Sequence, residues 1–259
     1  MAGRNGAVAP GAYPPPVDSP DEFIKRELDP EDERIEVGVA IVGGGTAGLA
    51  TANRLLQLLA DDPELLESLG EVPVAVIEKA KTCGGHTLSG AVVRPGPLQE
   101  LYPDLTREQW RQEGWAFGEV RKEAVYLTPN AKRAVRIPTP PPFRNHGNEI
   151  ISVSALARFQ QRLAEEGGAY VLTETAADRL LVTDGVVRGV RTGDKGRGRD
   201  GEPLGNFEPG TDLTAKVTVL AEGCWGHLTG AAIREFDLAE GREPQVWELG
   251  VKEVWKVPR

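Results

Sequence analysis

An α/β fold built on a parallel sheet is what the sequence predicts, and three observations support that prediction. Residues 37–42, 73–79 and 216–221 are short, nearly continuous runs of apolar and β-branched side chains. Such runs are typical of strands buried on both faces of a parallel sheet. The first run is followed by a glycine-rich turn and then by apolar side chains at helical spacing. Strand, turn, helix and second strand in this order predict a βαβ unit.

The remaining elements follow in chain order. Leu49, Ala52, Leu55, Leu56 and Leu59 place one apolar face on a helix over about 49–59. A polar insert at 61–72 separates this helix from the strand at 73–79. Residues 123–128 and 132–137 are expected to pair as a β-hairpin, and 180–183 should pair with 186–190 around Asp184-Gly185. A further helix, capped by Ser152 or Ser154, is expected before Gly167-Gly168.

The composition excludes several classes of protein. The 259 residues are 40% hydrophobic and 27% charged, which is typical of a globular chain and not of a disordered one. The 30 basic and 39 acidic side chains give a formal charge of −9, which disfavours nucleic acid as a partner. Two cysteines are too few for a disulfide framework, so secretion is not expected. We expect neither a signal peptide nor a membrane-spanning helix.

The sequence predicts three parts. Residues 1–33 are rich in proline and acidic side chains, and we expect a mobile leader. Residues 34–243 are expected to form the nucleotide-binding domain, with inserted loops at about 80–148. Residues 244–259 are expected to begin a second domain that is cut off, because Trp247, Leu249, Val251 and Trp255 suit a half-buried strand that would need a partner.

The glycine-rich turn has the spacing of a dinucleotide-binding motif, Gly43-x-Gly45-x-x-Gly48. Its position between a strand and a helix makes it specific. Gly43 is expected to make the tight turn, Gly45 to let the backbone approach a pyrophosphate, and Gly48 to allow close packing of helix on strand. The phosphates would then lie on the N-terminus of the helix, at Thr46 and Ala47.

Glu78, at the end of the second strand, is the candidate ligand of the ribose hydroxyls. It lies 35 residues after Gly43, whereas the usual acid follows the glycines by about 20 residues. The insert at 61–72 accounts for the difference. An acid at this position favours a ribose without a phosphate, but it does not separate NAD from FAD.

Longer motifs favour FAD over NAD, because they resemble those of a known family. The glycine motif with Glu78-Lys79, the runs Gly84 to Gly90 and Asn145 to Asn148, and the run Ala221 to Leu228 resemble the electron-transfer flavoprotein:ubiquinone oxidoreductase family. The resemblance extends from about Val37 to Trp255. It implies a Rossmann-like FAD-binding fold of the glutathione-reductase type with inserted β-hairpin segments. It also implies a non-covalent FAD, electrons taken from reduced electron-transfer flavoprotein, and ubiquinone as the acceptor.

The resemblance extends to individual site residues only in the flavin half of the family's site. No catalytic side chain and no metal ligand are expected, because the flavin carries the electrons. The cofactor-binding candidates are Gly43, Gly45, Thr46, Ala47, Gly48, Glu78, Lys79, Thr87, Leu88, Ser89, Gly90, Glu222 and Gly223. Cys83, Cys224 and the three histidines are more readily explained by packing and loop order than by redox or metal chemistry.

Two further properties of the family bear on this chain. The family carries a [4Fe–4S] cluster, which needs four cysteine ligands, and this sequence has two cysteines in total. We therefore expect a partial chain whose cluster ligands are absent. The family also contacts a membrane surface near the segment that matches 85–110. Here Leu98, Leu101, Tyr102, Leu105 and Trp110 suit either such a contact or core packing. A peripheral place on the cytoplasmic side of the bacterial inner membrane, or in the cytoplasm, is expected.

Two other functions remain open at this stage. A different FAD-dependent reductase or monooxygenase, acting on a lipid or an aromatic substrate, would share the glycine motif and the second strand. An inactive, truncated nucleotide-binding chain is the alternative without enzyme activity.

Overall fold

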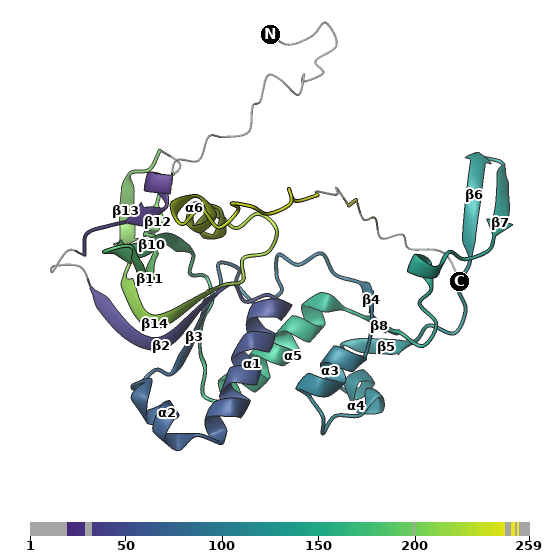
Figure 1. Ribbon diagram of the computed structural model, residues 1–259, viewed down its shortest axis with the longest axis horizontal. Helices are drawn as coiled ribbons and strands as arrows, with labels where there is room; N and C mark the ends of the chain where they lie inside the picture. The colour runs from purple at the N-terminus through teal and green to yellow at the C-terminus, as the bar shows by residue number, and fades with distance from the viewer. Residues whose placement is uncertain (1–19, 29–32, 199, 247–249, 252, 254–259) are drawn as a thin grey trace, which may run out of the picture.

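The computed structural model describes residues 20–28, 33–198, 200–246, 250–251 and 253. Its centre is a seven-stranded sheet with the order β1-β10-β11-β14-β2-β3-β9 (Figure 1). The strands β14, β2, β3 and β9 are mutually parallel. The strands of this sheet are β1 (Ile24–Lys25), β2 (Arg34–Val42), β3 (Val74–Ile77), β9 (Tyr170–Leu172), β10 (Ala177–Thr183), β11 (Val186–Thr192) and β14 (Asp212–Leu220).

The parallel part of the sheet is buried on both faces, as its apolar runs predict. Alternate side chains of β2 enter different cores: Val39 and Ile41 pack on one face, Ala40 and Val42 on the other. Helices α1 (Thr46–Ala60) and α5 (Val153–Glu166) cover the first face, and α6 (His227–Glu235) covers the second (Figure 1). The predicted α/β, Rossmann-like fold is thereby confirmed. The short helix α2 (Pro63–Ser68) occupies the insert predicted at 61–72.

Residues between β3 and α5 form a small subdomain where the sequence predicted inserted loops. Its three-stranded antiparallel sheet has the order β4-β8-β5. A separate hairpin, close to the predicted one, stands away from the rest of the molecule (Figure 1). The elements are β4 (Ala91–Val93), α3 (Gly96–Leu101), α4 (Arg107–Gln112), β5 (Ala116–Glu119), hairpin strands β6 (Val125–Asn130) and β7 (Arg133–Ile137), the 3-10 turn η3 (Pro141–Phe143) and β8 (Glu149–Ile151).

This subdomain has its own aromatic core, which decides between the two interpretations of the segment 98–110. Trp110 is 0% exposed and Tyr102 is 5% exposed. Trp110 packs against Trp115, with ring centroids 5.1 Å apart, and Trp115 contacts Phe159 of α5. Leu98, Leu101 and Leu105 pack against the same cluster. These side chains therefore belong to a core, which favours core packing over the alternative of a membrane contact through them.

The segment 20–28 is part of the fold, although the sequence placed it in a mobile leader. After the 3-10 turn η2 (Pro20–Glu22), β1 pairs in parallel with β10, and Ile24 is buried in the central core. Phe23 stacks on His227 of α6 with ring centroids 5.3 Å apart. The side chain of Lys25 lies 2.7 Å from the buried carboxylate of Asp212. The leader prediction thus fails for these residues because two apolar side chains and one buried acid hold them in place.

The last antiparallel elements connect β11 to β14. The hairpin β12 (Lys195–Arg197) and β13 (Pro203–Glu208) lies in the glycine-rich connection at 193–210. Among residues predicted to form a final strand, Trp247, Leu249 and Trp255 lie outside the described residues, and Val251 is 84% exposed. In the described ranges, no helix has the length and apolar character needed to cross a bilayer.

Candidate functional site

The glycine turn lies where β2 ends and α1 begins, and two of its glycines are required by close backbone contacts. Gly43 has a φ of +110°, and a Cβ there would lie 2.3 Å from the carbonyl oxygen of Ala221. A Cβ on Gly48 would lie 2.0 Å from the carbonyl oxygen of Gly43. Any side chain at either position would therefore displace the backbone directly after β2 or directly after β14. These are the contacts expected of a tight turn and of a helix packed closely on its strand.

Gly45 differs from its neighbours, because a Cβ added to it would meet no atom within 4 Å. It is the N-cap residue of α1, and no side chain caps this helix. The first amides of a helix have no partner within the helix. The first turn of α1 contains Thr46, Ala47 and Gly48. Its amides therefore have no partner within the helix and lie beside open space. This is the arrangement that binds a phosphate.

The other two long helices that begin at this edge of the sheet are capped from within the protein. Ser152 caps α5, because its hydroxyl accepts a hydrogen bond from the amide of Ala155 at 3.2 Å. The carboxylate of Glu222 accepts hydrogen bonds from the amide and the hydroxyl of Thr229 in α6, both at 2.7 Å. The N-cap residues of α1 and α6, Gly45 and Gly226, have no capping side chain, but of the three helix starts only that of α1 also receives no such acceptor from elsewhere in the described chain.

Glu78 lies directly after β3, next to the glycine turn, and is 9% exposed. One of its carboxylate oxygens accepts a hydrogen bond from the amide of Gly44 at 2.8 Å, and the other from the amide of Ala80 at 2.7 Å. A carboxylate has about four lone-pair positions, so acceptor capacity for two ribose hydroxyls remains. The neighbouring Lys79 is exposed.

Cys83 packs against the glycine turn, and its thiol is unreactive near neutral pH. A Cβ on Gly44 would lie 2.5 Å from its Sγ atom, so the thiol packs directly against the turn. Burial, followed by the charges of Glu78 and Glu165, raises the pKa of Cys83 to about 12. The thiolate, which is the reactive form, is therefore absent near neutral pH.

The candidate segment Thr87–Gly90 lies against α5. It is joined to the glycine turn through the stretch from Glu78 to Cys83. Leu88 is 65% exposed, whereas the hydroxyl of Ser89 turns towards α5 and lies 2.9 Å from that of Ser152. Ser152 and Ser154 are partners of Ser89 that the sequence did not predict. The sequence gives no signal for this contact, because the partners are 63 and 65 residues apart.

Glu222 and Gly223 follow β14 and lie beside the glycine turn through Ala221. The side chain of Glu222 is engaged with α6, as described above. A Cβ on Gly226 would clash with this side chain at 2.5 Å, so glycine is required there too. Glu222 and Gly223 can therefore contact a ligand only through their backbone groups at the end of the strand.

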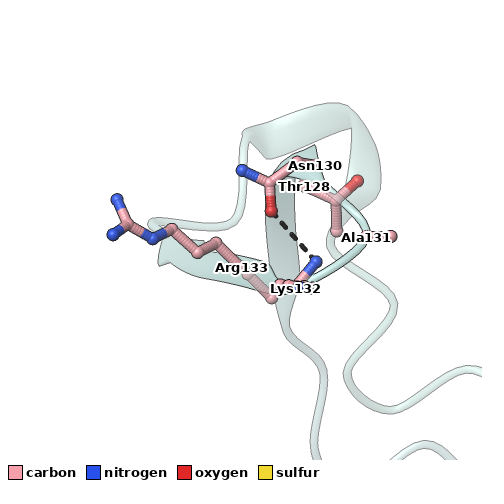
Figure 2. A pocket seen from close by; sticks show the side chains of 6 residues that line it. Thr128, Asn130, Ala131, Lys132 and Arg133 are labelled. Carbon is pink, nitrogen blue, oxygen red and sulfur yellow. Dashed lines mark hydrogen bonds between the residues drawn. The ribbon is translucent and has the colours of Figure 1, made fainter.

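Two concavities on the surface lie away from the glycine turn. One, of about 450 Å³, is at the tip of the β6–β7 hairpin, where the side chain of Asn130 accepts a hydrogen bond from the amide of Lys132 at 3.0 Å (Figure 2). The other, of about 840 Å³, lies near the starts of β2 and β14. Neither is lined by residues of the turn. Within the part of the chain that the structure describes, no three His, Cys, Asp or Glu side chains gather as metal ligands would.

Comparison with known proteins identifies relatives of this chain. No protein-family model matches it. A probable electron transfer flavoprotein-ubiquinone oxidoreductase from Acinetobacter baylyi is 37% identical over 232 residues, which are 88% of this chain and 39% of the relative. The mitochondrial electron transfer flavoprotein-ubiquinone oxidoreductase of Dictyostelium discoideum is 40% identical over 90% of this chain and 37% of its own length. The Pseudomonas aeruginosa protein of the same name is 38% identical over 88% of this chain and 40% of its own length.

These matches confirm the resemblance that the motifs predicted. The chain spans about two fifths of the length of these curated relatives. Among solved structures, a geranylgeranyl bacteriochlorophyll reductase-like protein from Thermoplasma acidophilum is similar over 73% of this chain and 40% of its own, with 19% identity and a TM-score of 0.47. PqsL, a probable FAD-dependent monooxygenase from Pseudomonas aeruginosa, is similar over 82% of this chain and 48% of its own, with 18% identity and a TM-score of 0.47.

Proposed function

We propose that this chain, related over most of its length to the electron transfer flavoprotein-ubiquinone oxidoreductases, is the FAD-binding part of an enzyme that takes electrons from reduced electron-transfer flavoprotein and passes them to ubiquinone. The names of the relatives supply the reaction. The observation on this chain that carries the proposal is the uncapped start of α1 beside Glu78.

The residues of this site fit an FAD. The turn formed by Gly43, Gly45 and Gly48, with the amides of Thr46 and Ala47, would hold the pyrophosphate. Glu78 would accept the hydroxyls of the adenosine ribose, with Lys79 exposed beside it. The segments that would lie towards the flavin are Thr87, Leu88, Ser89 and Gly90 from one loop and Glu222 and Gly223 from another.

FAD supplies the electron-transfer chemistry when it is bound. The chain's own residues bind the cofactor, fix its orientation and limit the access of water. The proposed site needs no side chain that moves a proton, and the raised pKa of Cys83 keeps its thiol out of redox exchange at neutral pH.

The iron–sulfur cluster of the family is not part of this proposal, because the sequence holds two cysteines and the cluster needs four. We place the chain at the cytoplasmic side of a bacterial inner membrane, as a peripheral protein. Two facts support this location. The relatives from Acinetobacter and Pseudomonas are bacterial, and the proposed acceptor is a lipid of the membrane.

The test begins with FAD binding to the full chain, measured by quenching of FAD fluorescence, with Gly45→Val as the matched control. We expect saturable binding by the unsubstituted chain and none by the variant. The bound flavin should then be reduced by electron-transfer flavoprotein that has itself been reduced, and a short-chain ubiquinone should reoxidise it. If NADPH reduces the bound FAD and reduced electron-transfer flavoprotein does not, the result would favour a reductase or monooxygenase. A chain that binds no FAD would contradict the proposal as a whole.

A further inference from the structure

Three serine hydroxyls meet at the first turn of α5, beside the proposed flavin site. The Oγ atom of Ser89 lies 2.9 Å from that of Ser152 and 3.0 Å from that of Ser154, and the latter two are 3.3 Å apart. Each hydroxyl can donate one hydrogen bond and accept others. The three can therefore form a closed triangle in which each serine donates to the next.

The triangle also satisfies the amides at the start of α5. Ser152 accepts a hydrogen bond from the amide of Ala155, the third residue of the helix. Ser89 accepts one from the amide of Ser154, the second residue, at 3.4 Å. A residue from a distant loop thus completes the cap of this helix, and loop and helix stabilise each other.

The same loop contacts α5 at two more points on one face of the helix. The amide of Cys83 donates a hydrogen bond to the side chain of Gln161 at 3.3 Å. Gly84, with a φ of +76°, comes so close that a Cβ would lie 2.8 Å from the Cβ of Ala157. The contacts at residues 154, 157 and 161 follow helical spacing. The loop from Cys83 to Ser89 therefore runs along α5 and ends at the serine triangle.

We propose that Ser152 and Ser154 are positioning residues: they hold Ser89 and thereby fix the backbone of Thr87–Gly90 in the conformation that receives the flavin. This inference rests on the proposed function. Glycine at positions 84, 85 and 90 gives the segment much freedom when it is not held. Fixing it before the cofactor arrives removes an ordering cost from binding. Leu88, 65% exposed, is then presented outward from a fixed backbone.

Ser154→Ala tests the inference, because Ser154 is not the N-cap residue and its loss leaves the Ser152 cap in place. Hydrogen–deuterium exchange of the peptide covering residues 84–90 should rise in the FAD-free variant. The dissociation constant for FAD should rise about 3- to 10-fold, which corresponds to one hydrogen bond. The visible circular dichroism of the bound flavin should change. Ser154→Thr, which keeps a hydroxyl, should restore all three properties.

The controls separate this inference from the proposed function. Ser68→Ala removes a hydroxyl that bonds within α2, to the carbonyl of Leu65, and it should alter none of the three readouts. In a double-mutant cycle, the variant that carries both Ser89→Ala and Ser154→Ala should lose much less FAD affinity than the sum of the losses in the two single variants. If the unsubstituted chain binds FAD and Ser154→Ala changes neither the exchange nor the spectrum, the positioning role alone is overturned. If the unsubstituted chain binds no FAD, both the role and the proposed function fail.

Discussion

At the scale of single residues, the glycine motif contains positions with opposite requirements. Gly43 and Gly48 face backbone carbonyls at distances that no side chain tolerates, whereas Gly45 faces open space. The same residue type is therefore needed for folding at two positions and, under the proposed function, for ligand access at the third.

Gly45→Val should leave the free energy of unfolding nearly unchanged and abolish FAD binding, because its side chain would fill the proposed place of the pyrophosphate. Gly43→Ala should instead lower the free energy of unfolding by about 1–3 kcal/mol, owing to its φ and to the nearby carbonyl of Ala221. Urea unfolding and FAD titration of both variants check this contrast. Equal destabilisation by the two substitutions would contradict it.

Glu78→Ala should weaken FAD binding by about 1–3 kcal/mol, because it removes the proposed ribose acceptor. It should also destabilise the FAD-free protein, since the amides of Gly44 and Ala80 lose a buried acceptor. Calorimetric titration and thermal unfolding measure the two effects. Glu64→Ala, at an exposed position in α2, is the matched control. An unchanged FAD affinity would identify another residue as the ribose ligand.

The two cysteines should differ in reactivity. Cys83 is buried with a pKa of about 12, whereas Cys224 is exposed. At pH 8, iodoacetamide should add one label per native chain, at Cys224, and two labels in guanidinium chloride. Because the pKa of Cys83 is higher in the folded state than in the unfolded state, its contribution to stability is complete below about pH 8.5 and declines as the pH rises towards 12. Peptide mapping by mass spectrometry locates the labels, and rapid labelling of Cys83 in the native chain would refute its burial.

At the scale of elements, one buried carboxylate joins the N-terminal segment to the sheet. Asp212 is 0% exposed, and it pairs with Lys25 of β1 at 2.7 Å and with Arg191 of β11 at 2.8 Å. A strand of two residues cannot be stable by itself. The position of β1 thus depends on the Lys25–Asp212 ion pair and the burial of Ile24, together with the neighbouring Phe23–His227 stack and the Arg26–Glu235 ion pair.

Asp212→Asn should lower the free energy of unfolding by about 3–5 kcal/mol, because two largely buried cations would then face a neutral amide. Trypsin should also cut faster after Lys25 and Arg26 in the variant, since β1 is released. Asp178→Asn, which removes an exposed charge next to Arg179, is the control and should cost less than about 1 kcal/mol. Equal proteolysis of the variant and the unsubstituted chain would show that β1 is held by other contacts.

Local patterns made much of these elements predictable, and the exceptions have a physical cause. The apolar runs at 37–42 and 73–79, the glycine spacing and the turn at Asp184-Gly185 are signals carried by neighbouring residues. By contrast, β1 exists only through β10, which lies more than 150 residues later in the chain. The capping of α6 by Glu222 and the contact of Ser89 with α5 are likewise tertiary. They depend on distances that no local pattern encodes.

At the scale of the whole molecule, the protein has two kinds of core. The cores on the two faces of the sheet are mainly aliphatic, and the core of the small subdomain is aromatic. The sequence of this subdomain is rich in glycine and proline and suggested loops. Its tryptophans nevertheless bury enough apolar surface to order α3, α4 and the β4-β8-β5 sheet.

Trp110→Ala should therefore lower the free energy of unfolding by about 3–5 kcal/mol, through lost burial and the cavity it leaves. Binding of the variant to lipid vesicles should match that of the unsubstituted chain. Phe117→Ala, at a side chain that is 66% exposed, is the control and should have little effect on stability. A loss of vesicle binding without a loss of stability would instead restore Trp110 as a membrane contact.

Helix α5 contributes to both kinds of core. Its Ala157 and Ala164 pack beneath the parallel sheet, and its Leu156 and Phe159 belong to the aromatic cluster. The Cys83–Ser89 loop rests on the same helix. A substitution that shifts α5 would therefore disturb both cores and the Cys83–Ser89 loop at the same time.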